Sequence, residues 1–225
     1  QRQMCIRDRN STKSGGSSTV GASPLCMYPS STIAHLPPHS SASSRMAAAR
    51  LWNMAAACAT EGLATDADVD AVARSFGGVE HRIELVRELH GVKYYNDSIA
   101  SSPSRTIAGL HSFKQKVILI AGGYDKHIPF DVLGPEICAH VKTLVLCGAT
   151  ADKIRAAVEN APEYRKGAPE ILEANDLREA VALCRKAAQP GDIVTLSPAC
   201  AAFDQFKNFM ERGKTFKSIV NSWQE

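Results

Sequence analysis

The chain has 225 residues, of which 44% are hydrophobic and 22% charged, and its formal net charge is +3. This composition excludes fully disordered, collagen-like and disulfide-scaffold proteins, and no apolar run approaches the roughly 18 residues that a membrane span requires. Aromatic residues make up 6%, and five of the basic residues lie before Met46, so neither stacking nor charge favours a nucleic-acid partner. The seven cysteines form no C-x-x-C pair, which is typical of reduced thiols in a cytoplasmic protein.

The first 45 residues differ in composition from the rest of the chain. The segment from Asn10 to Arg45 contains eleven serines, no acidic residue and no apolar periodicity. Residues 4–9, Met-Cys-Ile-Arg-Asp-Arg, are what the end sequence of a transposon-based sequencing adapter would encode. We therefore expect residues 1–45 to be a non-native or disordered tail. An out-of-frame translation caused by a sequence-assembly error is favoured over a real linker, and the fold prediction starts at Met46.

Residues 46–96 predict two helices and a β-hairpin. The first helix covers Trp52–Ala59 and is rich in small residues. The pattern Thr65-x-x-Asp68 is typical of a helix N-cap. The helix that it predicts ends at Gly77-Gly78 and carries apolar residues at helical spacing, namely Val69, Val72, Ala73 and Phe76. Two β-rich runs, Ile83–Leu89 and Val92–Asn96, are joined by His90-Gly91 and predict the hairpin.

From residue 102 onward, short apolar runs alternate with helical patterns. The apolar runs predict strands at Val117–Ile120, Thr143–Cys147, Glu170–Glu173 and Ile193–Leu196. Helical patterns cover 103–110, 152–158 and 176–187, and we expect Gly213 to separate two last helical segments, 203–210 and 216–223. We predict an α/β fold, with a Rossmann-like, mostly parallel sheet and helices on both faces.

Polar and glycine-rich segments follow three of the predicted strands. They are Asn96-Asp97-Ser98, the run Gly122–Lys126, and Ser197–Cys200. In open α/β sheets, ligands bind beyond the carboxyl ends of the strands. We therefore expect a site built from at least three strand ends.

The motifs of several common enzyme classes are absent. There is no G-x-G-x-x-G, which disfavours a classical dinucleotide site, and no G-x-x-x-x-G-K-[ST], so the chain has no phosphate cradle of its own. There is no H-E-x-x-H or G-x-S-x-G either, and the histidines lack metal-ligand spacing. We expect neither a catalytic residue nor a metal ligand in this chain.

Five motifs occur in a particular order: Gly77–Arg82, Tyr95–Ser98, Ile120–Lys126, Leu196–Ala201, and Phe203–Phe209 with Arg212-Gly213. This ordered set resembles the C-terminal part of the Mur ligases. Within that family, it is most similar to the ligases that add D-glutamate. The resemblance covers about Trp52 to Gln224. It implies that residues 46–80 are the end of a central ATP-binding domain, and that 81–225 are the Mur ligase C-terminal domain.

The resemblance also implies a reaction. In this family, ATP phosphorylates the alanyl carboxylate of UDP-N-acetylmuramoyl-L-alanine, and the amine of D-glutamate attacks the resulting acyl phosphate in peptidoglycan precursor synthesis. The magnesium ligands and the phosphate cradle belong to the central domain of a chain about twice as long. We therefore expect the present chain alone to be inactive, with the missing N-terminal and central domains as its partners in cis.

Six residues match positions with known roles in the family. Lys126, Ser101, Phe203 and Phe209 match residues that hold D-glutamate, while Arg82 and Asp97 match residues that contact the nucleotide. The residues alone leave other roles open. Lys126 is then a solvated loop lysine, Ser101 an N-cap serine near Pro103, and Phe209 part of the core, while Arg82 and Asp97 take part in an ion pair at a domain seam.

Three positions depart from the family pattern. Ile99 replaces a lysine, Ala202 replaces a serine that bonds D-glutamate, and Ala49-Arg50 replaces a His-Asn pair. Two other functions stay open: a stand-alone α/β module that binds a small anionic ligand at Lys126, and a dehydrogenase-like nucleotide-binding domain. The missing glycine fingerprint argues against the second.

Overall fold

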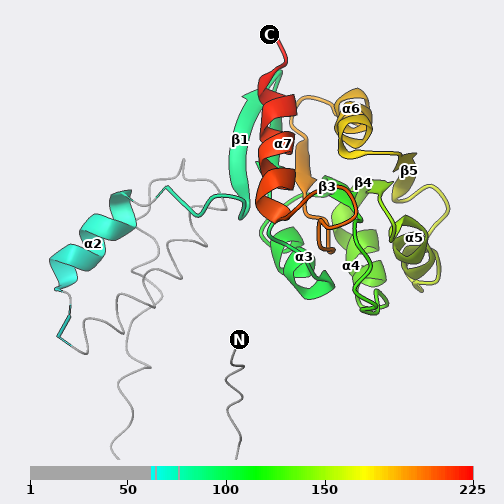
Figure 1. The fold of residues 1–225 in the computed structure, drawn as a ribbon, viewed down its shortest axis with the longest axis horizontal. Coiled ribbons are helices and arrows are strands. Elements are labelled where there is room, and N and C mark those ends of the chain that lie inside the picture. The colour runs from blue at the N-terminus through cyan, green and yellow to red at the C-terminus, as the bar shows by residue number, and fades with distance from the viewer. Residues whose placement is uncertain (1–61, 64, 76, 225) are drawn as a thin grey trace, which may run out of the picture. The chain divides into compact units, whose positions relative to one another are not determined.

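A computed structural model describes residues 62–63, 65–75 and 77–224. The predicted helix at 52–59, the tail and the departure at Ala49-Arg50 lie outside the described residues. Six strands form one sheet: β1 Glu84–Leu89, β2 Val92–Asn96, β3 Val117–Ala121, β4 Val141–Cys147, β5 Glu170–Ala174 and β6 Ile193–Leu196. Their order is β1-β2-β6-β3-β4-β5 (Figure 1). β1 pairs antiparallel with β2 in the predicted hairpin, and the other pairs are parallel, which confirms the predicted strands.

The described helices are α2 Asp66–Ser75, α3 Pro103–Leu110, α4 Leu133–His140, α5 Ala151–Glu159, α6 Leu177–Ala187 and α7 Phe209–Asn221. Side chains of β3 alternate between two apolar cores, as the pleat of a strand requires. Leu119 packs with residues of α3, α4 and α5, whereas Ile118 and Ile120 pack with residues of α6 and α7. Helices therefore cover both faces of the sheet (Figure 1), and the predicted fold class is confirmed.

Capping residues fix the starts of two helices where the sequence predicts them. The backbone amide of Thr65 donates to Oδ2 of Asp68 at 2.8 Å, and the amide of Asp68 donates to Oγ1 of Thr65 at 3.3 Å. Asp176 caps α6 by accepting a hydrogen bond of 2.8 Å from the backbone amide of Glu179. Each bond satisfies a helix-terminal group that has no partner within the helix.

The prediction for residues 203–223 was wrong in two ways. Residues 203–208 form turns, in which Ala202 O accepts from the amides of Gln205 and Phe206, and α7 begins only at Phe209. Gly213 does not separate a pair of helices, because α7 runs through it. A β-carbon at position 213 would overlap the buried ring of His81, so glycine is required there for close packing. No described helix is long and apolar enough to span a membrane.

Candidate ligand-binding site at the strand ends

The carboxyl ends of β2, β6 and β3 meet at one edge of the sheet, because these strands are adjacent and parallel. Backbone hydrogen bonds join the segments that follow them. The amide of Asp97 donates to Leu196 O at 2.8 Å, and the amide of Gly122 donates to Pro198 O at 2.9 Å. The three polar segments singled out in the sequence therefore lie side by side.

The loop after β3 carries Lys126 toward the segment that follows β2. Gly122 and Gly123 turn the chain with φ values of 114° and 146°, which L-residues with a side chain rarely adopt. Lys126 is exposed, and its Nζ lies 3.5 Å from the backbone carbonyl oxygen of Ser101. Lys126 and Ser101, both predicted to bind the substrate, are thus neighbours. The neighbouring acid, Asp125, is paired with Lys153, and within the described segments of the chain no ion pair involves Lys126.

Asp97 is a buried carboxyl group at the end of β2, with 4% of its surface exposed. Oδ2 accepts a hydrogen bond of 2.8 Å from the hydroxyl of Ser197, and Oδ1 accepts one of 3.3 Å from the amide of Ile83. Burial raises the pKa of Asp97 to about 6, although these hydrogen bonds and the positive charges of Arg82 and Arg105 act in the opposite direction. The structure therefore brings Asp97 and Arg82, the two predicted nucleotide-contacting residues, within electrostatic reach of each other.

The two predicted phenylalanines lie in different surroundings. Phe203 is 62% exposed, and its ring meets that of Tyr124 edge to face at a centroid separation of 5.9 Å. Phe209 is half-buried at the start of α7, and its ring meets the imidazole of His81 at 6.0 Å. The carbonyl of Phe209 also accepts a hydrogen bond of 2.7 Å from the hydroxyl of Ser98. Phe203 is therefore free to contact a ligand, whereas Phe209 also belongs to the packing between α7 and β2.

Arg212 holds these segments together, a role that was not predicted from the sequence. Its guanidinium is buried and donates to four acceptors at 2.9–3.1 Å: Ser98 Oγ, Ser98 O, Cys200 O and Ala201 O. No ion pair within the described ranges involves Arg212, and burial lowers its pKa to about 10. The Arg212-Gly213 pair in the last motif was the available signal, but nothing in the sequence shows that the arginine points inward.

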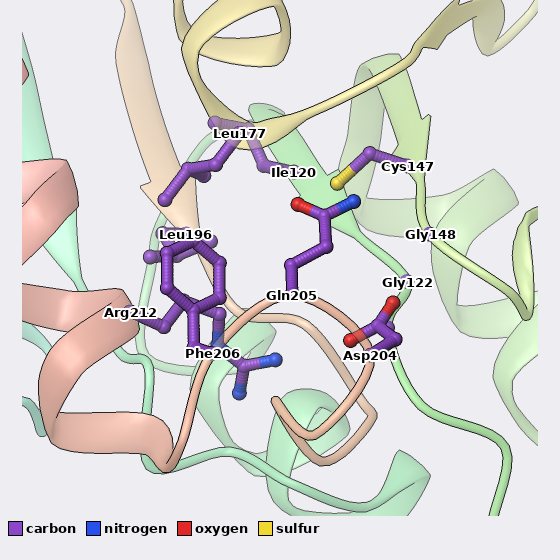
Figure 2. Close-up of a pocket in the computed structure, with 11 residues that line it drawn as sticks. Ile120, Gly122, Cys147, Gly148, Leu177, Leu196, Asp204, Gln205, Phe206 and Arg212 are labelled. Atoms are coloured by element: carbon purple, nitrogen blue, oxygen red, sulfur yellow. The ribbon is translucent and has the colours of Figure 1, made fainter.

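The hollow beside Arg212 is too small to be the ligand site by itself. Its volume is about 10 Å³, close to the space that one water molecule needs. Figure 2 shows Gln205 reaching across it toward Cys147, with Phe206 lying beside Leu196. A more open hollow of about 450 Å³ lies between the loop after Lys126 and α5. None of the six predicted site residues lines either hollow.

The four cysteines within the described residues are free, buried thiols. Burial raises the pKa of Cys147 to about 12 and that of Cys200 to about 11. Such thiols are protonated at neutral pH, which makes them poor nucleophiles and poor metal ligands. The strand ends thus offer hydrogen bonding and positive charge rather than a reactive thiol.

Comparison with known proteins identifies relatives of this domain. The family described as Mur ligase, glutamate ligase domain, matches residues 81–200. The protein named UDP-N-acetylmuramoylalanine–D-glutamate ligase from Acetivibrio thermocellus is 62% identical over 153 residues, covering 67% of this chain and 33% of the relative. Its namesake from Clostridium kluyveri is 56% identical over 168 residues, covering 75% and 37%. The chain thus spans about a third of the length of these curated relatives.

Two solved structures share the fold at low sequence identity. E. coli FolC in complex with ADP gives a TM-score of 0.52 at 14% identity, covering 74% of this chain and 38% of that one. The Mycobacterium tuberculosis folylpolyglutamate synthase complexed with ADP and AMPPCP gives 0.51 at 16% identity, covering 76% and 39%. These likenesses support the α/β fold alone.

Proposed function

Because the chain belongs to the Mur ligase family, we propose that it is the D-glutamate-binding part of an ATP-dependent, peptide-bond-forming ligase. The full enzyme adds D-glutamate to UDP-N-acetylmuramoyl-L-alanine in peptidoglycan precursor synthesis, and we place this reaction in the cytoplasm. The support is the match to the glutamate ligase domain together with the names of relatives that are 56–62% identical.

One observation carries the D-glutamate assignment within this chain. Lys126 presents an ammonium group at the strand ends, 3.5 Å from the Ser101 carbonyl, and no described carboxylate forms an ion pair with it. D-glutamate carries two carboxylates, so a fixed cation distinguishes it from neutral amino acids. We assign the hydroxyl of Ser101, whose backbone carbonyl neighbours this cation, to a second contact with the substrate, and the exposed ring of Phe203 to its methylene groups.

Holding the substrate is this domain's contribution to the reaction. The amine of D-glutamate must approach the carbonyl carbon of an acyl phosphate, after which phosphate leaves and an amide bond remains. Fixing one carboxylate at Lys126 restricts the position of the amine, and such restriction accounts for a large part of the rate gain in reactions between two bound substrates. Buried Arg212 keeps the segments around Ser98 and Cys200 in place for this task.

The described strand ends fit a nucleotide only partly. Arg82 and the carboxyl of Asp97 are suited to polar groups of ATP, but the sequence has no phosphate cradle. Of the two described clusters of potential metal ligands, the one beside the segment after β2 is Glu80, His81 and Glu84, and its carboxylates already bind the ammonium of Lys217. The residues present at the strand ends therefore do not fit a magnesium site. We therefore assign the phosphates and the metal to the missing central domain, with its end at residues 46–80, and assign 81–225 to the C-terminal domain.

A chimeric enzyme tests this proposal. Residues 81–225 replace the matching C-terminal part of the Acetivibrio thermocellus relative, and phosphate release is measured with ATP, UDP-N-acetylmuramoyl-L-alanine and D-glutamate. We expect release that depends on D-glutamate and not on L-glutamate, and none from the 225-residue chain alone. An inactive chimera would contradict the proposal if the same junction supports activity with the C-terminal part of the Clostridium kluyveri relative. Substrate-dependent ATP hydrolysis by the chain alone would contradict the assignment of the ATP site to the missing domain.

A further inference from the structure

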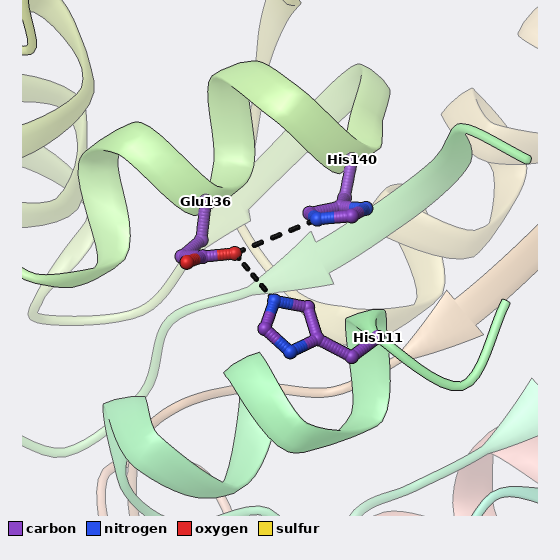
Figure 3. A group of neighbouring side chains, drawn as sticks. All are labelled: His111, Glu136 and His140. Atoms are coloured by element: carbon purple, nitrogen blue, oxygen red, sulfur yellow. Dashed lines mark hydrogen bonds and ion pairs between the residues drawn. The ribbon is translucent and has the colours of Figure 1, made fainter.

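Two histidines and one glutamate from neighbouring helices meet on the surface of the domain (Figure 3). His111 follows the last residue of α3, while Glu136 and His140 lie one turn apart in α4. Nε2 of His111 is 2.6 Å from Oε2 of Glu136, and Nε2 of His140 is 3.5 Å from the same oxygen. Each side chain offers one ligand atom within 4.8 Å of the other two.

The backbone that carries these three side chains is firmly held. Leu110, directly before His111, is 1% exposed, and Ile137, directly after Glu136, is 0% exposed. Both belong to the core on the α3, α4 and α5 face of the sheet. The spacing of four residues puts Glu136 and His140 on one face of α4. Small side-chain rotations are therefore enough to adjust the ligand atoms.

We propose that His111, Glu136 and His140 form a Zn²⁺ site. In a tetrahedral zinc site, nitrogen and oxygen ligands lie about 2.0–2.2 Å from the metal and hence about 3.3–3.5 Å from one another. The His140–Glu136 separation of 3.5 Å falls in this range, whereas the His111–Glu136 separation of 2.6 Å is that of a hydrogen bond, which a bound ion would replace and lengthen. Two imidazoles and one carboxylate suit Zn²⁺, whereas Mg²⁺ and Ca²⁺ prefer oxygen ligands alone. The side chains are 51%, 31% and 35% exposed, so an ion can enter and water can complete the coordination.

A second cluster of potential metal ligands is less suited to a metal ion. Glu80, His81 and Glu84 also lie close together, but Nζ of Lys217 donates to both carboxylates, at 3.0 and 2.6 Å. That ammonium already supplies the positive charge that a metal ion would bring. By contrast, the ion pairs of Glu136 with described residues are those with the two histidines.

The proposed zinc site is separate from the strand-end site. The C-terminal end of α3 precedes β3, and α4 ends directly before Val141, the first residue of β4. The cluster therefore lies at the amino edge of the parallel strands, opposite to Lys126. A bound ion would connect α3 to α4 and stabilise the folded domain, because ligands that bind only the native state raise its stability. Sequence spacing gave no sign of it, since 25 residues separate His111 from Glu136.

Metal titration of the 225-residue chain tests the site. Zn²⁺ binding is measured by calorimetry, and Co²⁺ is used as a spectroscopic probe of nitrogen and oxygen ligands. The variants are His111→Ala, Glu136→Gln and His140→Ala, with His127→Ala as the matched control, since His127 is an exposed histidine outside the cluster. Zinc bound by histidines or cysteines other than the cluster and His127 is common to all four variants, and His127→Ala shows what the loss of one exposed histidine does by itself.

We expect each cluster variant to lose one equivalent of Zn²⁺ or to bind it at least about tenfold more weakly, while His127→Ala keeps it. Zn²⁺ should raise the melting temperature of the unmodified chain and of His127→Ala by several degrees, but not that of the cluster variants, and Mg²⁺ should have no such effect. Equal Zn²⁺ stoichiometry and affinity in the unmodified chain and all three cluster variants would overturn the proposal. None of these readouts depends on ligase activity.

Discussion

Arg212 donates to both the hydroxyl and the backbone carbonyl of Ser98, at 3.0 and 2.9 Å, from a position that is 4% exposed. The same guanidinium also holds the carbonyls of Cys200 and Ala201. One side chain at the start of α7 therefore joins the segments that follow β2 and β6. A buried cation bound mainly by backbone oxygens is costly to remove, because the acceptors left behind lose their partner away from water.

Arg212→Met should lower the free energy of unfolding by about 3 kcal/mol, since several charge-assisted hydrogen bonds are lost. Arg212→Lys should cost less, because an ammonium group retains up to three donors but cannot reproduce the planar fork. Urea unfolding of the 225-residue chain, followed by circular dichroism, measures both. Arg178→Met is the matched control on exposed surface and should change stability by less than about 0.5 kcal/mol. Equal effects at positions 178 and 212 would contradict the linking role of Arg212.

Asp97 should make stability depend on pH in an unusual direction for an acid. Burial raises its pKa in the folded chain to about 6, above the ordinary value of 3.8. The folded state therefore binds the proton more tightly than the unfolded state. This contribution to stability is fully present below about pH 4 and is lost as pH rises through about 6. The loss amounts to about 3 kcal/mol across that window, and Asp97→Asn should remove it.

Carboxyl-carbon NMR titration checks the same prediction without unfolding the chain. Asp97 should titrate near pH 6. Asp125 serves as the internal control, because its hydrogen bond with the Lys153 ammonium holds its pKa below the usual range. A midpoint for Asp97 at or below that of Asp125 would show that the hydrogen bonds from Ser197 and Ile83 outweigh burial.

The apolar strands could be predicted from sequence because a parallel strand buried on both faces is a continuous apolar run, as in Val117–Ile120. The order of the strands could not, since nothing local shows that β6 inserts between β2 and β3. α4 was missed because Gly134 and Pro135 in its first turn are typical of a loop. In the candidate site, the resemblance was enough to predict Lys126, the last residue of one ordered motif, and Ser101, three residues after another, whereas the inward direction of Arg212 is a tertiary property.

Gly213 is typical of a helix break in the sequence, and its actual role in close packing gives a stability prediction. Alanine favours a helix interior by about 1 kcal/mol over glycine. At position 213, however, a β-carbon would overlap Nδ1 of His81 and lie 3.1 Å from Nδ2 of Asn96, and both neighbours are buried. We expect Gly213→Ala to destabilise the chain by about 1–3 kcal/mol, as overpacking does. In a double-mutant cycle measured by urea unfolding, His81→Ala should relieve most of this cost. An unchanged cost in the His81→Ala background would place the steric conflict elsewhere.

Lys126 should govern the use of D-glutamate in the chimeric enzyme, a prediction that rests on the proposed function. A charge-assisted hydrogen bond contributes about 1.5–3 kcal/mol, or about tenfold to a hundredfold in affinity. Ala202 lacks a hydroxyl that could share this task, so we expect a value toward the upper end. Lys126→Ala should raise the KM for D-glutamate much more than the KM for ATP.

Two further variants make the Lys126 prediction specific. Lys126→Arg should restore D-glutamate binding only partly, because a wider guanidinium fits a site for a point charge poorly. Lys166→Ala is the control for a general loss of positive charge. This exposed lysine lies in the segment that leads into β5, and therefore at the amino ends of the parallel strands, away from Lys126. Steady-state kinetics with each substrate varied in turn measures these effects. If Lys126→Ala leaves D-glutamate saturation unchanged, or weakens ATP more, the cation that binds D-glutamate lies elsewhere in the enzyme, even where the chimera itself is active.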